Sequence, residues 1–103
     1  KMLHDQVATV RKAGAKWVGT IANRLEGKFD WQDAFVSRLV DELGNGKSYH
    51  QRLLYIEICV VLKKHIKLNN FERLCRPTLD RLKVDPVANV KSFYDKKLTN
   101  GEI

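Results

Sequence analysis

The sequence contains no apolar run long enough to cross a bilayer, which takes about 20 residues in a helix. Its longest run, 58-ICVVL-62, is short and is followed by two lysines. The opening residues, KMLHDQ, lack the small-residue cleavage site of a signal peptide. We therefore expect neither a membrane span nor a secretory leader, and we expect the chain to be a fragment of a longer protein.

Cysteine is scarce, and its spacing forms no known pair. The two cysteines, Cys59 and Cys75, each lie in an apolar stripe of a predicted helix. Cysteine in such a position is typically a buried, reduced thiol. The sequence therefore predicts free thiols and a reducing compartment, the cytoplasm and also the nucleus.

Motifs that carry catalysis or bind metals are missing. The sequence has no HExxH, no CxxC and no glycine-rich phosphate loop. The three histidines have no serine or cysteine partner at a spacing that indicates a nucleophile. We expect a protein that is not an enzyme, with no catalytic residues, no metal site and no cofactor.

What the sequence does have is positive charge. The formal net charge is +7 and the isoelectric point is about 9.6. One interpretation is a solvated surface rich in lysine, since several lysines close predicted helices, where cations complement the helix dipole. The other is a basic surface that binds nucleic acid or an acidic protein segment. The residues that would do so are Arg11, Lys12, Lys16, Arg52, Lys63, Lys64 and Lys67.

The apolar positions recur at helical spacing, and no segment alternates with period two as a strand does. The pattern predicts five helices, over residues 7–25, 31–43, 48–66, 70–82 and 86–98. Asp5, Asp30 and Asp85 precede helices as expected N-caps. Glycines at 27, 44, 46 and 101 follow helices, where they favour a left-handed stop.

Three further expectations concern packing. The helix over 48–66 is apolar nearly all round, which places it in the middle of the domain. Pro77 should kink the helix over 70–82, because proline removes a backbone hydrogen bond. Trp17 and Trp31 are expected in the core, between the first two helices.

A repeat organises the chain. The stretches 4-HDQVATVRKA-13 and 84-VDPVANVKSF-93 share Asp-x-Val-Ala-x-Val followed by a basic residue. Arg11, Arg52 and Lys91 occupy equivalent places in alternate helices, with separations of 41 and 39 residues. A period near 40 with two helices per unit is typical of HEAT and armadillo solenoids. The sequence thus predicts an all-α solenoid of HEAT repeats, with five helices in antiparallel pairs and units at 1–27, 28–68 and 69–103.

The repeated aspartate and basic residue suggest a ladder of ion pairs between stacked units. The aspartate of one unit is expected to pair with the basic residue of the next unit, and Asp5, Arg11 and Asp85 are the expected ladder and cap residues. The middle unit has Gly46 where the aspartate belongs and 48-SYHQR-52 in place of the regular motif. We expect the ladder to be interrupted there.

The spacing and the residue identities resemble the C-terminal HEAT repeats of the scaffold (A) subunit of protein phosphatase 2A and related regulatory subunits of phosphatase 4. The resemblance lies in 5-DQVATVRKAGAKWVGTIANRL-25, Trp31, 49-YHQRLLYIEICVVL-62 and 77-PTLDRLKVDPVANVK-91. The irregular Tyr-His-x-Arg repeat between two regular ones is its most specific part. Lys91, where arginine is usual, and Gln6, where proline is common, depart from the family pattern.

The resemblance implies a non-catalytic scaffold that holds a serine/threonine phosphatase catalytic subunit, with further regulatory subunits as additional partners. In that family the contacts lie along the turns within each repeat, which here are residues 1–6, 44–50 and 83–89. Tyr49 is either an interface anchor or packed under the preceding helix, and His50 is either a contact or a polar residue at a helix start. The partner-binding candidates are Thr9, Tyr49, His50, Arg52, Asp85, Pro86, Asn89 and Lys91.

Overall fold

The computed structural model describes the backbone of residues 2–25 and 27–103 and the side chains of residues 12–25, 27–28 and 30–103. Within these ranges the chain is helical and has no strand. None of the helices described is both long and apolar enough to pass through a membrane. The prediction of an all-α chain is therefore confirmed.

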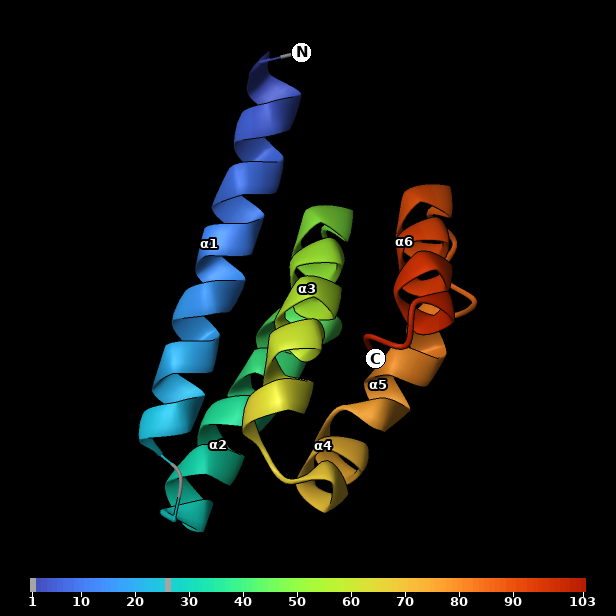
Figure 1. Cartoon of the computed structure of the whole chain (residues 1–103). Helices are drawn as coiled ribbons and strands as arrows, with labels where there is room; N and C mark the ends of the chain where they lie inside the picture. Colours follow the sequence, from blue (N-terminus) through green and yellow to red (C-terminus); the bar gives the residue numbers. More distant parts are fainter. Residues whose placement is uncertain (1, 26) are drawn as a thin grey trace.

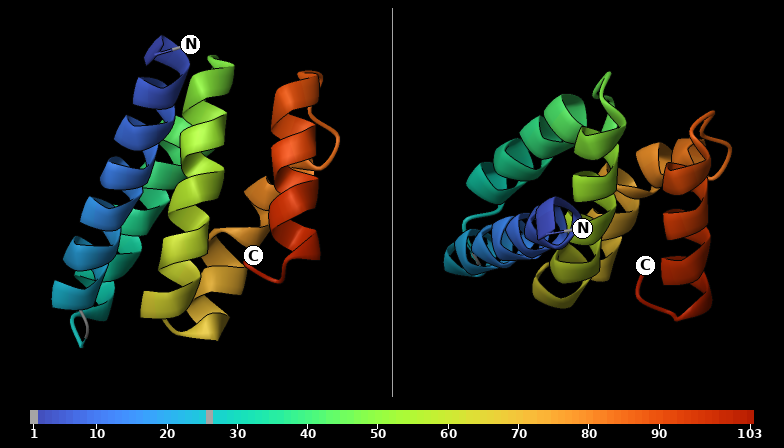
Figure 2. Two further views of the ribbon diagram at one scale, coloured as in Figure 1. Left: turned by 45° about the horizontal axis from the view of Figure 1, so that its top comes forward. Right: turned by 90° about the horizontal axis from the view of Figure 1, so that it is seen from above.

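The helices lie in two rows. The elements are α1 (Met2–Arg24), α2 (Phe29–Leu39), the π-helical turn η1 (Val40–Gly44), α3 (Tyr49–His65), α4 (Leu68–Leu74), α5 (Arg76–Leu82) and α6 (Ala88–Thr99). Helices α1, α3 and α6 run in the same direction, while α2 and the α4–α5 segment run in the opposite direction (Figure 1). One row has α1 beside α3 and α3 beside α6; the other has α2 beside α4 and η1 beside α5 (Figure 2).

The core is centred on α3. Its side chains are buried on nearly every side, including Tyr55, Ile56, Ile58 and Cys59. This helix contacts α1, η1, α4 and α6, so most of its surface meets a neighbour. The prediction from its uniformly apolar sequence is confirmed, because a helix without a polar face needs packing partners all round.

Small residues bring α1 close to α3. Ala15 and Ala22 are buried, and a Cβ added to Gly19 would lie 2.3 Å from Cγ1 of Val61. A tryptophan does not fit on that face. Trp17 lies on the other side of α1 and is 68% exposed, and Trp31 on α2 is 73% exposed. The prediction that both tryptophans are in the core is therefore wrong.

Pro77 breaks the expected fourth helix into two. α4 ends at Leu74 and α5 begins at Arg76, with Cys75 between them. Proline has no N–H to bond the carbonyl four residues earlier and its ring crowds that turn. The helix predicted over 70–82 as one kinked element is thus two short helices.

Helices end at all three predicted glycine stops, and the left-handed conformation expected there is confirmed at two of them. Gly27 and Gly101 have positive φ angles of 83° and 74°. Gly44 and Gly46 do not, so the left-handed conformation expected there is wrong. A Cβ on Gly44 would lie 2.6 Å from Cγ2 of Thr78 and 3.2 Å from the Tyr55 ring. Gly44 is therefore required by close packing rather than by backbone conformation.

Helix starts differ from the expected aspartate caps. α1 begins at Met2, so Asp5 lies inside the helix and residues 2–6 are not a turn; the Asp5 side chain lies outside the described residues. Asp30 lies in the first turn of α2, after the N-cap Lys28, where its charge still complements the helix dipole. α6 has Val87 as its N-cap, two residues after Asp85.

Candidate functional site

Two turns meet at one end of the molecule. Residues 45–48 connect η1 to α3, and residues 83–87 connect α5 to α6. Both turns lie at the upper ends of α3 and α6 in Figure 1. A cavity of about 450 Å³ separates them, and we call the surface around it the turn ridge. Its lining residues are Gly44, Asn45, Gly46, Lys47, Arg52, Arg81, Leu82, Val84, Asp85 and Pro86.

Arg52 sits at the centre of the turn ridge and contacts both turns. Its Nε lies 2.7 Å from Oδ2 of Asp85, a close ion pair although the N–H is not aligned as in a hydrogen bond. Its Nη2 donates to Oδ1 of Asp85 at 3.3 Å. Its Nη1 donates to the carbonyls of Gly46 and Lys47 at 2.9 and 3.0 Å. The guanidinium fork therefore ties the first turn to the second.

Asp85 completes this link from the other side. Its Oδ1 also accepts the backbone N–H of Val87 at 2.9 Å, which caps the turn before α6. The side chains of Arg52 and Asp85 are only 13% and 5% exposed. Removal of either partner from such a buried pair destabilises the folded state, because the remaining charge is then buried without a counter-charge.

The Arg52–Asp85 pair corresponds to one rung of the predicted ladder, with the order reversed. The expectation paired the aspartate of one unit with the basic residue of the next; here Arg52 pairs with the aspartate that follows it. On the other side, the Gly46 carbonyl accepts from Arg52 where the repeat lacks an aspartate. The side chains of Asp5 and Arg11 lie outside the described residues, so their part in a ladder stays a prediction.

The rim of the turn ridge carries most of the other candidates. Tyr49 is 36% exposed, so the preceding helix does not enclose its ring, which lies 4.1 Å from the His50 ring between centroids. The candidates exposed around these turns are Tyr49, His50, Pro86, Asn89 and Lys91. Thr9 lies outside the described side chains. The structure thus gathers one predicted group at this end, but with Arg52 and Asp85 inside it rather than on its surface.

Sequence reasoning did not name two basic residues of the turn ridge as candidates, although Lys47 lies in the contact turn expected over 44–50. Arg81 donates to Oδ1 of Asn45 and lies 3.4 Å from Oγ1 of Thr78, while exposed Lys47 precedes α3. The available signal was the position of Arg81 in the last turn of α5, two residues before the second intra-pair connection. That spacing places it beside the turn but does not show that the first turn lies opposite.

The basic residues proposed for an acidic ligand do not form one surface. Arg52 is engaged at the turn ridge, and Arg11 lies outside the described side chains. Lys12, Lys16 and Lys64 line a different cavity, between α1, α3 and α6. Lys63 and Lys67 do not line it. The seven residues therefore separate into at least two places.

Cys59, Cys75 and Tyr55 form a buried polar cluster in the core. Cys59 and Cys75 are buried free thiols, as predicted, and the Tyr55 hydroxyl donates to the Cys75 carbonyl at 3.2 Å. Burial raises the pKa of Tyr55 and that of the Cys59 thiol. The Cys59 thiol is thereby held in its neutral form, which is a poor nucleophile. The hydrogen bond with Cys59 lowers the pKa of the Cys75 thiol. In the part of the chain the structure describes, no three His, Cys, Asp or Glu side chains gather as metal ligands would.

The fold and the site define an all-α chain of antiparallel helical pairs whose intra-pair turns are tied together by a buried ion pair. Over 90 residues the chain is 29% identical to serine/threonine-protein phosphatase 4 regulatory subunit 4 of Mus musculus, and to the same subunit of Homo sapiens. The similarity covers 87% of this chain and 10% of each relative, so the chain spans about a tenth of their length. No protein-family model matches the chain. No solved structure matches it either.

Proposed function

We propose that the chain is part of a non-catalytic HEAT-repeat regulatory subunit and that its turn ridge holds a serine/threonine phosphatase catalytic subunit. The observation that carries this proposal is the 29% identity to a phosphatase 4 regulatory subunit over most of this chain. A cytoplasmic or nuclear location and the unit boundaries at 1–27, 28–68 and 69–103 belong to the same proposal.

The arrangement of the helices supports a repeat scaffold. Three helices that run in the same direction carry Arg11, Arg52 and Lys91 at separations of 41 and 39 residues. Stacked pairs of this kind bury their apolar faces against their neighbours, which leaves the turns on one edge free for a partner. A continuous edge of turns then offers an extended binding surface.

The Arg52–Asp85 pair would hold the binding surface in shape before the partner binds. Because the pair ties both turns together, exposed groups such as Lys47, Tyr49 and Lys91 are held at fixed separations. A partner that binds pre-positioned side chains loses less conformational entropy in ordering them. The catalytic chemistry in this proposal belongs entirely to the partner.

The test is binding of a phosphatase 4 catalytic subunit to the whole chain with Lys47→Glu and Lys91→Glu combined. Both lysines are exposed at the turn ridge, so the change alters its charge without disturbing the buried pair. We expect the dissociation constant to rise by about tenfold or more, since two favourable contacts become repulsive. Arg52→Glu is unsuitable because it would leave Asp85 buried beside a second negative charge.

Lys28→Glu and Lys96→Glu combined are the matched control. They make the same charge change at two exposed positions, one at the start of α2 and one in the last turn of α6, each at the opposite end of its helix from the turn ridge. Binding of this double variant should be unchanged. Equal binding of both variants, or equal loss in both, would contradict the proposal.

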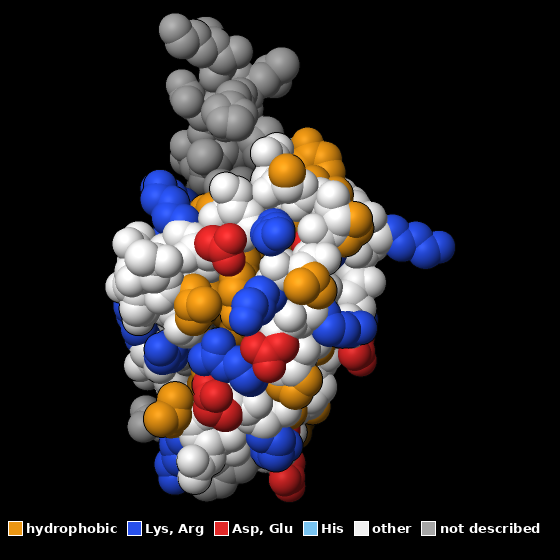
Figure 3. Space-filling view, turned by 90° about the vertical axis from the view of Figure 1, so that its right-hand side faces the viewer, with side chains coloured by type: hydrophobic (Ala, Val, Ile, Leu, Met, Phe, Trp, Pro, Cys, Tyr) orange, Lys and Arg blue, Asp and Glu red, His pale blue; other side chains and the backbone are white. Residues whose placement is uncertain are grey.

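The alternative of a nucleic-acid surface has less support on the side formed by α5 and α6. There the lysine and arginine side chains alternate with aspartate and glutamate and with apolar patches (Figure 3). A phosphate backbone binds best along an uninterrupted basic track. Mixed charge of this kind suits a protein partner better.

A further inference from the structure

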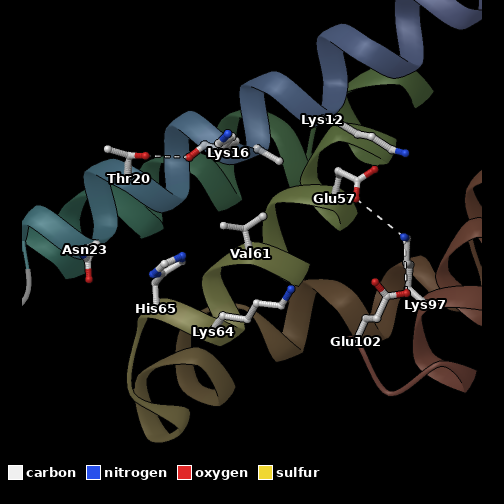
Figure 4. A pocket seen from close by; sticks show the side chains of 11 residues that line it. Lys12, Lys16, Thr20, Asn23, Glu57, Val61, Lys64, His65, Lys97 and Glu102 are labelled. Atoms are coloured by element: carbon white, nitrogen blue, oxygen red, sulfur yellow. Dashed lines mark hydrogen bonds and ion pairs between the residues drawn. The ribbon is translucent and has the colours of Figure 1, made fainter.

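A second cavity lies on the face of the molecule formed by α1, α3 and α6. Its volume is about 650 Å³, and Figure 4 shows side chains from all three helices around it. We call it the lysine groove. The residues that line it are Lys12, Ala15, Lys16, Thr20, Asn23, Glu57, Val61, Lys64, His65, Lys97 and Glu102.

The charges of the lysine groove do not cancel. Lys97 lies 3.8 Å from a carboxylate oxygen of Glu57 and 3.5 Å from one of Glu102, so one lysine is shared between the two glutamates (Figure 4). Lys12, Lys16 and Lys64 form no ion pair with any residue whose side chain the structure describes. Three ammonium groups on two facing helices thus surround one hollow.

The floor of the groove is apolar and its width is set by packing. Ala15 is buried and Val61 is half-buried beneath the lysines. The close approach of α1 to α3 at Gly19 holds the two walls at a fixed separation. A ligand that fits here combines negative charge at its edges with small apolar groups in between.

We propose that the lysine groove binds a short acidic segment of a partner protein, with aspartate or glutamate side chains on Lys12, Lys16 and Lys64. Carboxylates bound by these lysines would be partly shielded from water by the α1 and α3 walls, which strengthens the attraction. The apolar floor would contact aliphatic side chains between the acidic ones. This proposal does not depend on the phosphatase, because none of these lysines belongs to the turn ridge.

Two observations favour a peptide over nucleic acid. Glu57 and Glu102 lie in the wall beside Lys97 and would repel a phosphate backbone that continued past the lysines. Base stacking needs exposed aromatic rings. Among the residues whose side chains the structure describes, the one ring that lines the groove is that of His65, and Trp17 does not line it. A short segment can place two or three carboxylates on the lysines and end before the glutamates.

The experiment measures binding of a short fluorescein-labelled peptide of glutamate, aspartate and leucine to the whole chain by fluorescence anisotropy. We compare the wild type with Lys12→Gln, Lys16→Gln and Lys64→Gln combined. The matched control combines Lys28→Gln, Lys83→Gln and Lys96→Gln, which removes the same charge from exposed positions outside the groove. We expect the groove variant to bind about tenfold more weakly or worse, and the control to stay within about twofold.

Several outcomes would overturn the proposal. Equal loss in both variants would mean that net charge alone attracts the peptide. Equal binding of a peptide with glutamine and asparagine in place of the acids would remove the role of the carboxylates. A single-stranded oligonucleotide that binds tighter than the peptide, with a steep salt dependence lost in the groove variant, would assign the groove to nucleic acid instead. Circular dichroism of each variant checks that the helices are retained.

Discussion

Gly44 has no room for even one more methyl group. The nearest atoms to an added Cβ belong to Thr78 and Tyr55, both of them buried. We predict that Gly44→Ala lowers the free energy of unfolding by about 1–3 kcal/mol, because overpacking moves neighbours out of their preferred positions. Urea denaturation measures this change.

Gly14 supplies the control for that substitution. A Cβ there would lie 3.8 Å from Cδ1 of Leu54, an ordinary contact, and the residue is inside α1. Gly14→Ala should therefore raise the free energy of unfolding by about 0.5–1 kcal/mol, since alanine favours a helix interior. If both variants shift stability in the same direction, close packing at Gly44 is not the cause.

The Arg52–Asp85 pair is best tested by a double-mutant cycle. Arg52→Met and Asp85→Asn each leave the remaining charge buried without its partner. Each substitution should therefore lower the free energy of unfolding more in the wild type than in the variant that already carries the other substitution. We expect a coupling energy of about 1–3 kcal/mol from chemical denaturation.

The Arg38–Glu42 pair provides the comparison. These side chains are 78% and 59% exposed on one helical surface, at an N–O distance of 3.1 Å. Solvent and salt screen such a pair, so its coupling should be much smaller. Equal coupling in the two cycles would mean that the turn ridge is not tied by its ion pair.

The buried thiol and phenol predict how stability depends on pH. Burial raises the pKa of Cys59 above its ordinary value of 9.0 and that of Tyr55 above 10.0. At neutral pH both groups are neutral in the folded and in the unfolded chain, so their ionisation does not lower the free energy of unfolding. Above about pH 9 the unfolded chain loses these protons while the folded chain keeps them, and stability falls. The hydrogen bond with Cys59 lowers the pKa of the Cys75 thiol, which offsets part of this fall. Denaturation across this range should show a smaller fall for Cys59→Ala and Cys75→Ala combined, and an equal fall would contradict the role of the two thiols.

At the scale of elements, the break between α4 and α5 is held by packing as well as by Pro77. Cys75, at the break, is buried and its carbonyl accepts from both Tyr55 and Leu79. We predict that Pro77→Ala does not fuse the two helices and lowers the free energy of unfolding by about 0.5–1 kcal/mol, because the unfolded chain becomes more flexible. A gain in stability with higher helix content by circular dichroism would show that proline alone causes the break.

Helix identity was predictable from the sequence, and helix ends were less so. The apolar spacing correctly located all five helical segments, because burial of one face repeats every three or four residues. The aspartates expected as caps were displaced, since α1 and α2 begin earlier than their capping signals and α6 begins later. A helix end depends on what the next segment packs against, which local sequence does not specify.

At the scale of the whole molecule, the two tryptophans mark one uncovered edge. Trp17 lies on the side of α1 away from α3. Trp31 lies two residues from Asp33, which pairs with Arg73 of α4 at 2.7 Å, so Trp31 points to the side of α2 away from that neighbour. If the chain is part of the proposed repeat array, an earlier helical pair would stack on this edge and cover both side chains.

We predict that acrylamide quenches the fluorescence of both tryptophans strongly in this chain. In a longer protein that contains a preceding helical pair, quenching should fall and the melting temperature should rise, because the exposed apolar surface becomes buried. A neutral quencher is chosen because the +7 charge of the chain would attract iodide. Unchanged quenching and melting temperature would count against a stacked array.

The sequence by itself determined the helical class, the central place of α3 and the grouping of basic and acidic residues near two turns, since these follow from apolar periodicity and repeat spacing. Only the tertiary structure decided which side of α1 is buried. Adjacent positions such as Trp17 and Val18 satisfy the same periodicity, and the close approach at Gly19 selects the smaller one. It likewise decided that Arg52 and Asp85 are enclosed partners and that Lys12, Lys16 and Lys64 meet around one groove, because residues far apart in the chain come together only when the helices pack.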